Sequence, residues 1–217
     1  MKTANKYLLL LVYSISITII AIVQSCAPVF SELQSARMVG KKRVELTPMF
    51  STVNAKSGTE QGHAQNELGL QGIIGLSNKV DLRLRSELIW ANFGDYSDVA
   101  VIIGFGPKIS LIENKLAISL PFGTVLNSDF INEFEFHPTL LFTLPAIPDK
   151  LDITVSPTFI WPFCEDCENA AAINLGLAVS SDLSEWAIRP EYGQLYDFGS
   201  KGHVGQFSIG LSKTFGN

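Results

Sequence analysis

After its first 25 residues the sequence lacks any long apolar run. A membrane-spanning helix needs about 20 consecutive apolar residues, so any later insertion into a membrane must use strands. Histidine is also scarce, with only three residues in the chain, His63, His137 and His203. Their spacing matches no metal motif and no nucleophile elbow. The sequence therefore predicts neither a metal site nor a cofactor.

Positive charge is in short supply as well. The chain has 16 basic and 21 acidic side chains, a net charge of −5, and no basic stripe. This balance argues against nucleic acid as a partner. At 217 residues, with 47 % hydrophobic residues and 17 glycines against 10 prolines, the composition fits one folded domain and shows no signature of disorder.

The first 25 residues have the layout of a secretory signal. Lys2 and Lys6 precede the uncharged, largely apolar stretch 8–23, which ends shortly before Cys26. Residues 23–26, Val-Gln-Ser-Cys, are similar to the lipobox of bacterial lipoproteins, in which the cysteine becomes the lipidated N-terminus. We therefore expect a signal peptide over 1–25 and lipidation of Cys26. Ordinary cleavage nearby, with Cys26 lost or unmodified, is the alternative.

Residues 26–42 connect the predicted signal peptide to the rest of the chain. Residues 31–34, Ser-Glu-Leu-Gln, have the spacing of a helix capping box, and Gly40 is placed to end a short helix. The segment is expected either to form that helix, packed in or under a barrel mouth, or to be a plain linker.

The stretch 80–90 shows the pattern that organises the remaining residues, 43–217. Apolar side chains fall on one parity, and Asp81, Arg83, Arg85 and Glu87 fall on the other. A strand, whose side chains alternate with period two, separates these two sets cleanly, whereas a helix would mix them. One face of this strand therefore requires apolar surroundings and the other requires water or charge partners.

The same pattern recurs in ten segments, most of them long enough to cross a bilayer at a tilt. They are 43–55, 64–77, 80–91, 98–112, 115–126, 133–144, 151–161, 170–180, 185–196 and 203–215. Short and longer connections alternate between them, and aromatic residues gather beside the longer ones. The pattern predicts an all-β fold: a closed antiparallel up-and-down transmembrane β-barrel of about ten strands, with both termini on the periplasmic side.

Several stretches resemble the small porin-like β-barrel proteins of the outer membrane of Gram-negative bacteria. The resemblance is carried by residues 32–37 (ELQSAR), 79–85 (KVDLRLR), 105–108 (FGPK), 136–142 (FHPTLLF) and 187–191 (AIRPE). It implies this fold and a location in the bacterial outer membrane, with membrane lipid as a partner. It implies no particular activity.

The inward parity collects a mixed set of charged residues. The predicted lumen cluster is Glu45, Asp81, Arg83, Arg85, Glu87, Lys108, Glu135, His137, Arg189 and Glu191. Paired charges and water can fill a barrel this narrow. Alternatively, the cluster lines a narrow pathway for small ions or solutes. His137 beside Glu135, together with inward serines, has the residue types of a hydrolase site. A histidine that is only hydrogen-bonded in the lumen is the commoner arrangement, and we therefore expect no enzymatic activity.

Cys164 and Cys167 lie in a longer connection, where an oxidising compartment favours a local disulfide over a redox pair or a zinc site. The longer connections are also acidic, which suits a solvated rim or, alternatively, binding of divalent cations. Their acids are Asp95, Asp98, Asp129, Glu133, Glu165, Asp166, Glu168 and Asp197.

Six prolines lie inside the expected strands, where proline removes a hydrogen bond of the ladder. They are Pro48, Pro107, Pro121, Pro138, Pro157 and Pro190. Each stands about six residues from the periplasmic end of its strand, so we expect a belt of bulges or kinks at one height.

The expected function is that of a structural or narrow porin-like outer-membrane barrel with a charged polar lumen. The rival is a lipid-anchored soluble barrel that binds a small apolar ligand, as lipocalins do. That rival requires apolar residues inside and polar residues outside.

Overall fold

The computed structural model describes residues 30–57, 60–93, 96–126, 134–164, 167–198 and 203–216. The predicted signal peptide 1–25 and the predicted lipidation site Cys26 lie outside the described residues. The same holds for seven of the acids in the longer connections, or for their side chains; these are Asp95, Asp98, Asp129, Glu133, Glu165, Asp166 and Asp197.

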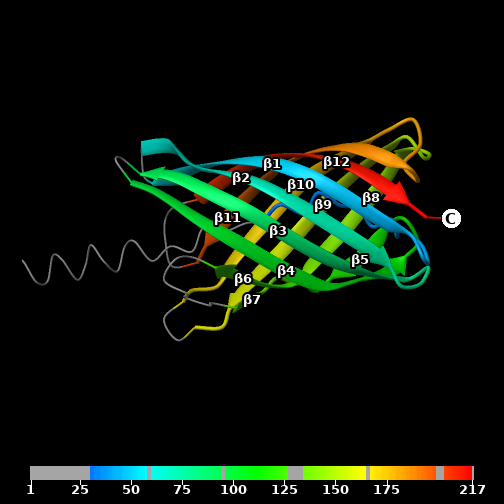
Figure 1. The fold of residues 1–217 in the computed structure, drawn as a ribbon, viewed down its shortest axis with the longest axis horizontal. Coiled ribbons are helices and arrows are strands. Elements are labelled where there is room, and N and C mark those ends of the chain that lie inside the picture. Colours follow the sequence, from blue (N-terminus) through cyan, green and yellow to red (C-terminus); the bar gives the residue numbers. More distant parts are fainter. Residues whose placement is uncertain are drawn as a thin grey trace, which may run out of the picture.

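Twelve strands appear in the described ranges. They are β1 (Val44–Ser57), β2 (Glu60–Gly75), β3 (Val80–Phe93), β4 (Tyr96–Ile112), β5 (Leu116–Ser119), β6 (Phe122–Leu126), β7 (Phe134–Phe136), β8 (Thr139–Ile147), β9 (Leu151–Pro162), β10 (Ala170–Val179), β11 (Trp186–Asp197) and β12 (His203–Phe215). Every strand pairs antiparallel with its neighbours, β12 pairs with β1, and β9 pairs with β10, so the sheet closes into a barrel (Figure 1). The predicted fold class is confirmed.

Two of the ten predicted strands are interrupted, which explains why twelve are present. The predicted strand 115–126 is divided into β5 and β6 at Leu120–Pro121, and the strand 133–144 is divided into β7 and β8 at His137–Pro138. Proline has no N–H to donate, so the ladder breaks at these points. The wall nevertheless stays closed, because β4 pairs with both β5 and β6 and β9 pairs with both β7 and β8.

Four of the six prolines form a continuous band across neighbouring strands. The Pro107 carbonyl accepts from Leu120 N, the Pro121 carbonyl from His137 N, and the Pro138 carbonyl from Phe159 N, with N···O distances of 2.9, 2.9 and 3.1 Å. Pro157 lies two residues from Phe159 on β9. Pro48 and Pro190 lie within β1 and β11, on either side of β12. The expected strand irregularities are therefore present at Pro121 and Pro138, and the common height of all six stays a prediction.

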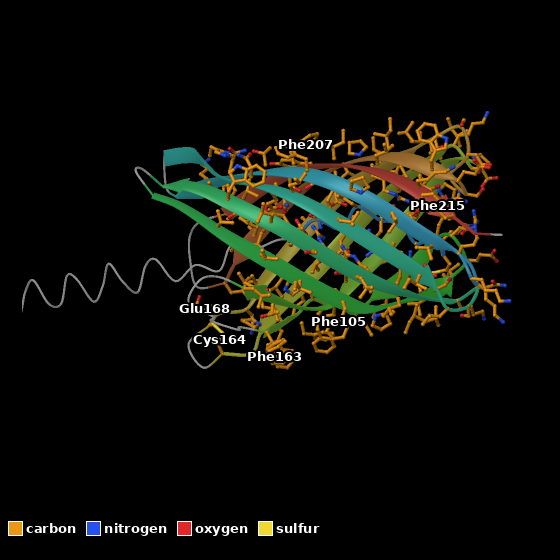
Figure 2. The ribbon with its side chains drawn as sticks, viewed as in Figure 1. Phe105, Phe163, Cys164, Glu168, Phe207 and Phe215 are labelled. Carbon is orange, nitrogen blue, oxygen red and sulfur yellow. A yellow bond between two sulfur atoms is a disulfide. The ribbon has the colours of Figure 1, made fainter. Side chains whose placement is uncertain are left out.

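The two faces of the wall differ sharply in polarity. On β12, Gln206, Ser208 and Ser212 are buried inside, whereas Ile209 and Leu211 are exposed on the outside by 43 % and 54 %. The outer surface is covered with apolar side chains along the whole barrel (Figure 2). In the described part of the chain, no helix is long and apolar enough to cross a membrane.

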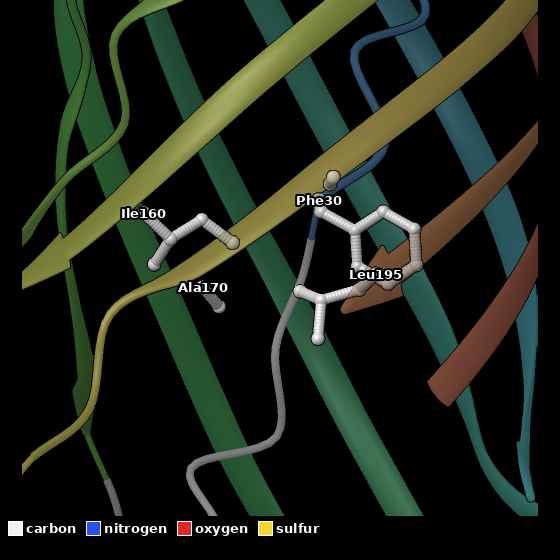
Figure 3. Packing of buried hydrophobic residues seen from close by; sticks show 5 residues of the cluster. Phe30, Ile160, Ala170 and Leu195 are labelled. Carbon is white, nitrogen blue, oxygen red and sulfur yellow. The ribbon is translucent and has the colours of Figure 1, made fainter. Parts of the chain in front are cut away.

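Residues 30–39, here called the lumen strap, run through the inside of the barrel. Phe30 packs against Ile160, Ala170 and Leu195, next to the longer connections (Figure 3). At the other end of the barrel, Lys42 N donates to the Gly75 carbonyl just before β1 begins. The strap therefore spans the barrel from the end with the longer connections to the end with the short ones.

Two sequence expectations are wrong at this point. The described residues 30–42 contain no helix, because the strap's backbone groups bond to the barrel wall instead of to one another. Moreover, Phe30 lies at the end of the barrel opposite to the start of β1, so the segment does not stay at the barrel mouth where β1 starts but crosses the lumen to reach it. The segment is a connection, as one alternative had it, but it fills the lumen.

The outward apolar face yields a test of depth. Ile209→Arg, near the middle of β12, is expected to lower the free energy of unfolding from lipid vesicles by about 2–4 kcal/mol, and Phe215→Arg, at the strand's end, by about 1 kcal/mol or less. The measurement is urea titration of the protein folded into vesicles. Equal effects at the two positions would contradict a membrane-spanning exterior.

Candidate functional site

The lumen is the candidate site, and most of the predicted charge cluster lies in it. Seven members are buried inside the barrel: Glu45, Asp81, Arg83, Glu87, Lys108, Arg189 and Glu191. The remaining three are partly buried: Arg85, Glu135 and His137. Alternation along the strands explains this placement, because all ten occupy the parity opposite to the exposed apolar side chains.

Glu191 on β11 holds the backbone of the strap. Its carboxylate accepts hydrogen bonds from Glu32 N at 2.6 Å and from Leu33 N at 2.9 Å. Leu33 has a φ of 49°, a left-handed conformation that a bulky side chain rarely adopts. The paired bonds to one carboxylate fix the chain in this conformation and prevent a regular helix from starting here.

Two arginines of β3 bind the strap from the opposite wall. Arg83 pairs with the Glu32 carboxylate at 2.7 Å and donates to the Glu32 carbonyl at 3.2 Å. Arg85 donates to the carbonyl and hydroxyl of Ser31 and also pairs with Glu87. A guanidinium carries several donors in a fixed plane, so each arginine binds the strap and a neighbouring residue at once.

The other half of the strap is held in the same manner. Lys108 Nζ donates to the Arg37 carbonyl at 2.7 Å, and Val39 N donates to Asp81 Oδ2 at 3.0 Å. Arg37 binds both carboxylate oxygens of Asp152, at 2.6 and 3.1 Å. The strap is therefore tied to β3, β4 and β9 at the end with the short connections.

The wall is also shaped around the strap at Phe30. Asn174 Nδ2 donates to the Phe30 carbonyl at 2.7 Å. A Cβ atom at Gly193 would lie 1.9 Å from Asn174 Oδ1 and 2.8 Å from Cε2 of the Phe30 ring, closer than either pair of atoms tolerates. Glycine at this position of β11 therefore makes the space that the ring occupies. The buried apolar cluster around Phe30 is here called its collar; it consists of Ile160, Ala170, Ala172 and Leu195. This collar and the space at Gly193 fit the strap closely into the lumen.

Some lumen charges pair within the wall alone. Arg189 pairs with Glu45 at 3.2 Å and donates to Ser212 Oγ, and His137 Nε2 lies 2.7 Å from Glu135 Oε2. The structure thus divides the predicted cluster into wall pairs and strap-binding groups. The absence of enzymatic activity stays a prediction.

Sequence reasoning missed the strap residues that complete the site. Ser31, Glu32 and Arg37 belong to the stretch assigned to a helix or linker, and their partners on the barrel wall lie 51 to 159 residues away in the chain. The one available signal was the Glu32–Arg37 stretch itself, which was noted as part of the family resemblance. Its charges have no neighbours of opposite sign at strand spacing, so nothing local linked them to the lumen.

Two small cavities flank the strap. One, of about 50 Å³, lies between Ser31–Glu32 and the wall near Ile102, Gly104 and Val125. The other, of about 90 Å³, lies beside Arg37–Val39 at the end with the short connections. A water molecule needs about 10–15 Å³ by this measure, so each cavity has room for a few waters.

Outside the lumen, Cys164 and Cys167 form a disulfide, the pairing the sequence favoured. Among the described residues, no group of three or more His, Cys, Asp or Glu side chains is arranged to hold a metal ion.

Comparison with known proteins finds a similarity of shape to solved structures and no match in sequence. No protein-family model and no curated protein matches the sequence. Among solved structures, Ail, the attachment invasion locus protein of Yersinia pestis, covers 81 % of this chain and 99 % of its own, with 10 % identity and a TM-score of 0.42. The translocator domain of the autotransporter NalP from Neisseria meningitidis covers 81 % and 90 %, with 8 % identity and a TM-score of 0.47. OmpT, an outer membrane protein of Vibrio cholerae, covers 88 % and 100 %, with 8 % identity and a TM-score of 0.33.

The strap contacts give a test of the site. Arg83→Met leaves the buried Glu32 carboxylate without its charge partner, which is expected to cost about 3–5 kcal/mol. Amide hydrogen exchange of residues 31–36, read by mass spectrometry, should then quicken while exchange in the barrel strands stays slow.

The control is Lys213→Met. Lys213 pairs with Glu185 at 3.5 Å on the surface, with half of its side chain exposed, and its removal should change stability by about 1 kcal/mol or less. Unchanged exchange of the strap in Arg83→Met would contradict its attachment through this pair.

Proposed function

We propose that this chain is a small β-barrel protein of the bacterial outer membrane whose lumen is held closed by its own strap. Two features support the location. The outer surface of the barrel is apolar, which suits lipid acyl chains as partner, and the closed sheet leaves no strand edge unpaired toward the lipid. The short connections then face the periplasm and the longer ones the exterior.

The strap is the observation that carries the proposal of a closed lumen. Residues 30–36 are all buried, and their backbone groups bond to wall side chains on several strands. Charges that bind the strap in this way are not free to line an open path. The protein is thus a structural barrel in its resting state rather than an open diffusion pore.

The lipocalin-like alternative has the opposite polarity. It needs an apolar interior for its ligand and a polar exterior for solubility. In the described residues the interior is rich in charged and hydroxyl side chains, and the exterior carries large apolar ones such as Phe207 and Leu211. The arrangement therefore favours a membrane barrel over a soluble carrier.

A narrow channel is the second candidate, and the two cavities on either side of the strap favour it. Displacing the strap would join them. The acids of the lumen outnumber the bases, so the opened barrel would prefer cations. With Glu32 and Arg37 displaced as part of the strap, the remaining acids are Glu45, Glu67, Asp81, Glu87, Glu135, Asp152 and Glu191, and the remaining bases are Arg83, Arg85, Lys108 and Arg189.

Conductance in planar lipid bilayers tests closure. The refolded full chain is expected to give no steady open current, whereas a variant lacking residues 30–38 should conduct and favour potassium over chloride. Heat-modifiable gel mobility of the variant verifies that its barrel has folded. A steady open current from the intact protein would overturn the closed state and leave the location untouched.

Location is tested by cell fractionation. The protein is expected with outer membranes, and it should stay there when Cys26→Ala removes the predicted lipid attachment, because the apolar barrel surface alone holds it. Release of the Cys26→Ala variant in soluble form would contradict the proposal that the barrel itself is inserted in the outer membrane.

A further inference from the structure

The direction in which the strap crosses the lumen determines where the chain before it must lie. β1 begins at the end with the short connections, and the strap leads backward from there along the lumen to Phe30. Phe30 belongs to a buried apolar cluster with Ile160 near the end of β9, Ala170 at the start of β10 and Leu195 near the end of β11. All three positions adjoin longer connections.

We propose that the chain N-terminal to the strap emerges on the external face of the outer membrane, so that Cys26 lies at the cell surface. The inference rests on the proposed function, which sets the longer connections outside. Any acyl chain on Cys26 would then insert into the outer leaflet of the membrane, whereas the sequence alone had suggested an anchor on the periplasmic side.

Chain length supports this placement. Cys26 lies four positions before Phe30, and an extended chain spans at most about 3.6 Å per residue, or about 14 Å over that distance. β1 has 14 residues, and a strand of that length tilted by about 40° rises about 35 Å along the barrel axis. Cys26 therefore cannot reach the periplasmic end while Phe30 stays in its collar.

The contacts at Phe30 keep it there. Its ring sits in a cluster of buried apolar side chains, its carbonyl accepts from Asn174 at 2.7 Å, and Gly193 leaves room for the ring. Below it, Glu32 and Leu33 are bound by Glu191 and Arg83. These contacts lie on opposite walls, so the strap cannot slide toward either end without breaking them.

Surface labelling of intact cells tests the proposal. Ala27→Cys is placed in a chain that also carries Cys164→Ser and Cys167→Ser, and the cells are treated with a membrane-impermeant polyethylene glycol maleimide, which gives a gel shift. Ala27→Cys is expected to shift on intact cells to the same extent as the control Glu168→Cys in a longer connection. Lys79→Cys in a short connection should shift only after the outer membrane is permeabilised.

The controls separate failure of this inference from failure of the proposed function. If Glu168→Cys shifts on intact cells and Ala27→Cys shifts only after permeabilisation, the external exit is overturned and the barrel's orientation stands. If Lys79→Cys shifts on intact cells and Glu168→Cys does not, the proposed orientation is wrong. A mature chain whose mass shows that it begins after position 29 also overturns the inference, since no segment would remain to emerge.

A disulfide cross-link provides an independent test of the strap's position. The pair Phe30→Cys and Leu195→Cys should form a disulfide on mild oxidation, whereas Phe30→Cys with Ala187→Cys, at the opposite end of β11, should not. Cross-linking of the second pair instead of the first would reverse the strap and overturn the external exit.

Discussion

The hydrogen bonding of the strap's backbone by wall side chains is the interaction on which the rest of the lumen depends. An irregular peptide inside a barrel has N–H and carbonyl groups that no ladder satisfies, and each one left unpaired costs about 1–3 kcal/mol. Here Glu191 accepts from two amides, Arg83 and Lys108 donate to carbonyls, and Asn174 donates to a third. The charged lumen therefore has a structural purpose before any question of transport arises.

The dependence runs in both directions, but only for part of the cluster. Without the strap, Arg83 would lose its carboxylate partner and Asp152 would lose its guanidinium. Arg189 and Glu45 would keep each other, because both belong to the wall. Buried unpaired charge is costly, so the strap-binding groups stabilise the closed state, whereas the wall pairs stay paired whether or not the strap is in place.

The sequence predicted what depends on alternation and missed what depends on long-range contact. Parity along 80–90 placed Arg83 and Glu87 inside and Leu88 outside, since a strand's period of two leaves little choice once the wall is closed. Pro121 and Pro138 predicted bulges or kinks in their strands, although nothing in the sequence indicated that each strand would be divided into two. The capping-box pattern at Ser31–Gln34 was misleading because it describes how four residues would satisfy one another alone. Inside the barrel, Glu32 meets Arg83 and Glu191, and these contacts outweigh the local preference.

A strap that crosses the whole lumen also constrains the order in which the barrel forms. Its partners lie on β3, β4, β9, β10 and β11, whereas the ring closes where the last strand, β12, meets the first, β1. Threading a peptide through a finished ring of this width would require the charged walls to separate. Closing the wall around a peptide already bound to β3 requires only ordinary strand pairing. Of the strands that bind the strap, β3 comes first in the sequence. The strap and β3 can therefore meet before Glu191 and Asn174 bind the strap, as the later strands complete the ring. The same contacts that close the lumen thereby help to direct the closure of the wall.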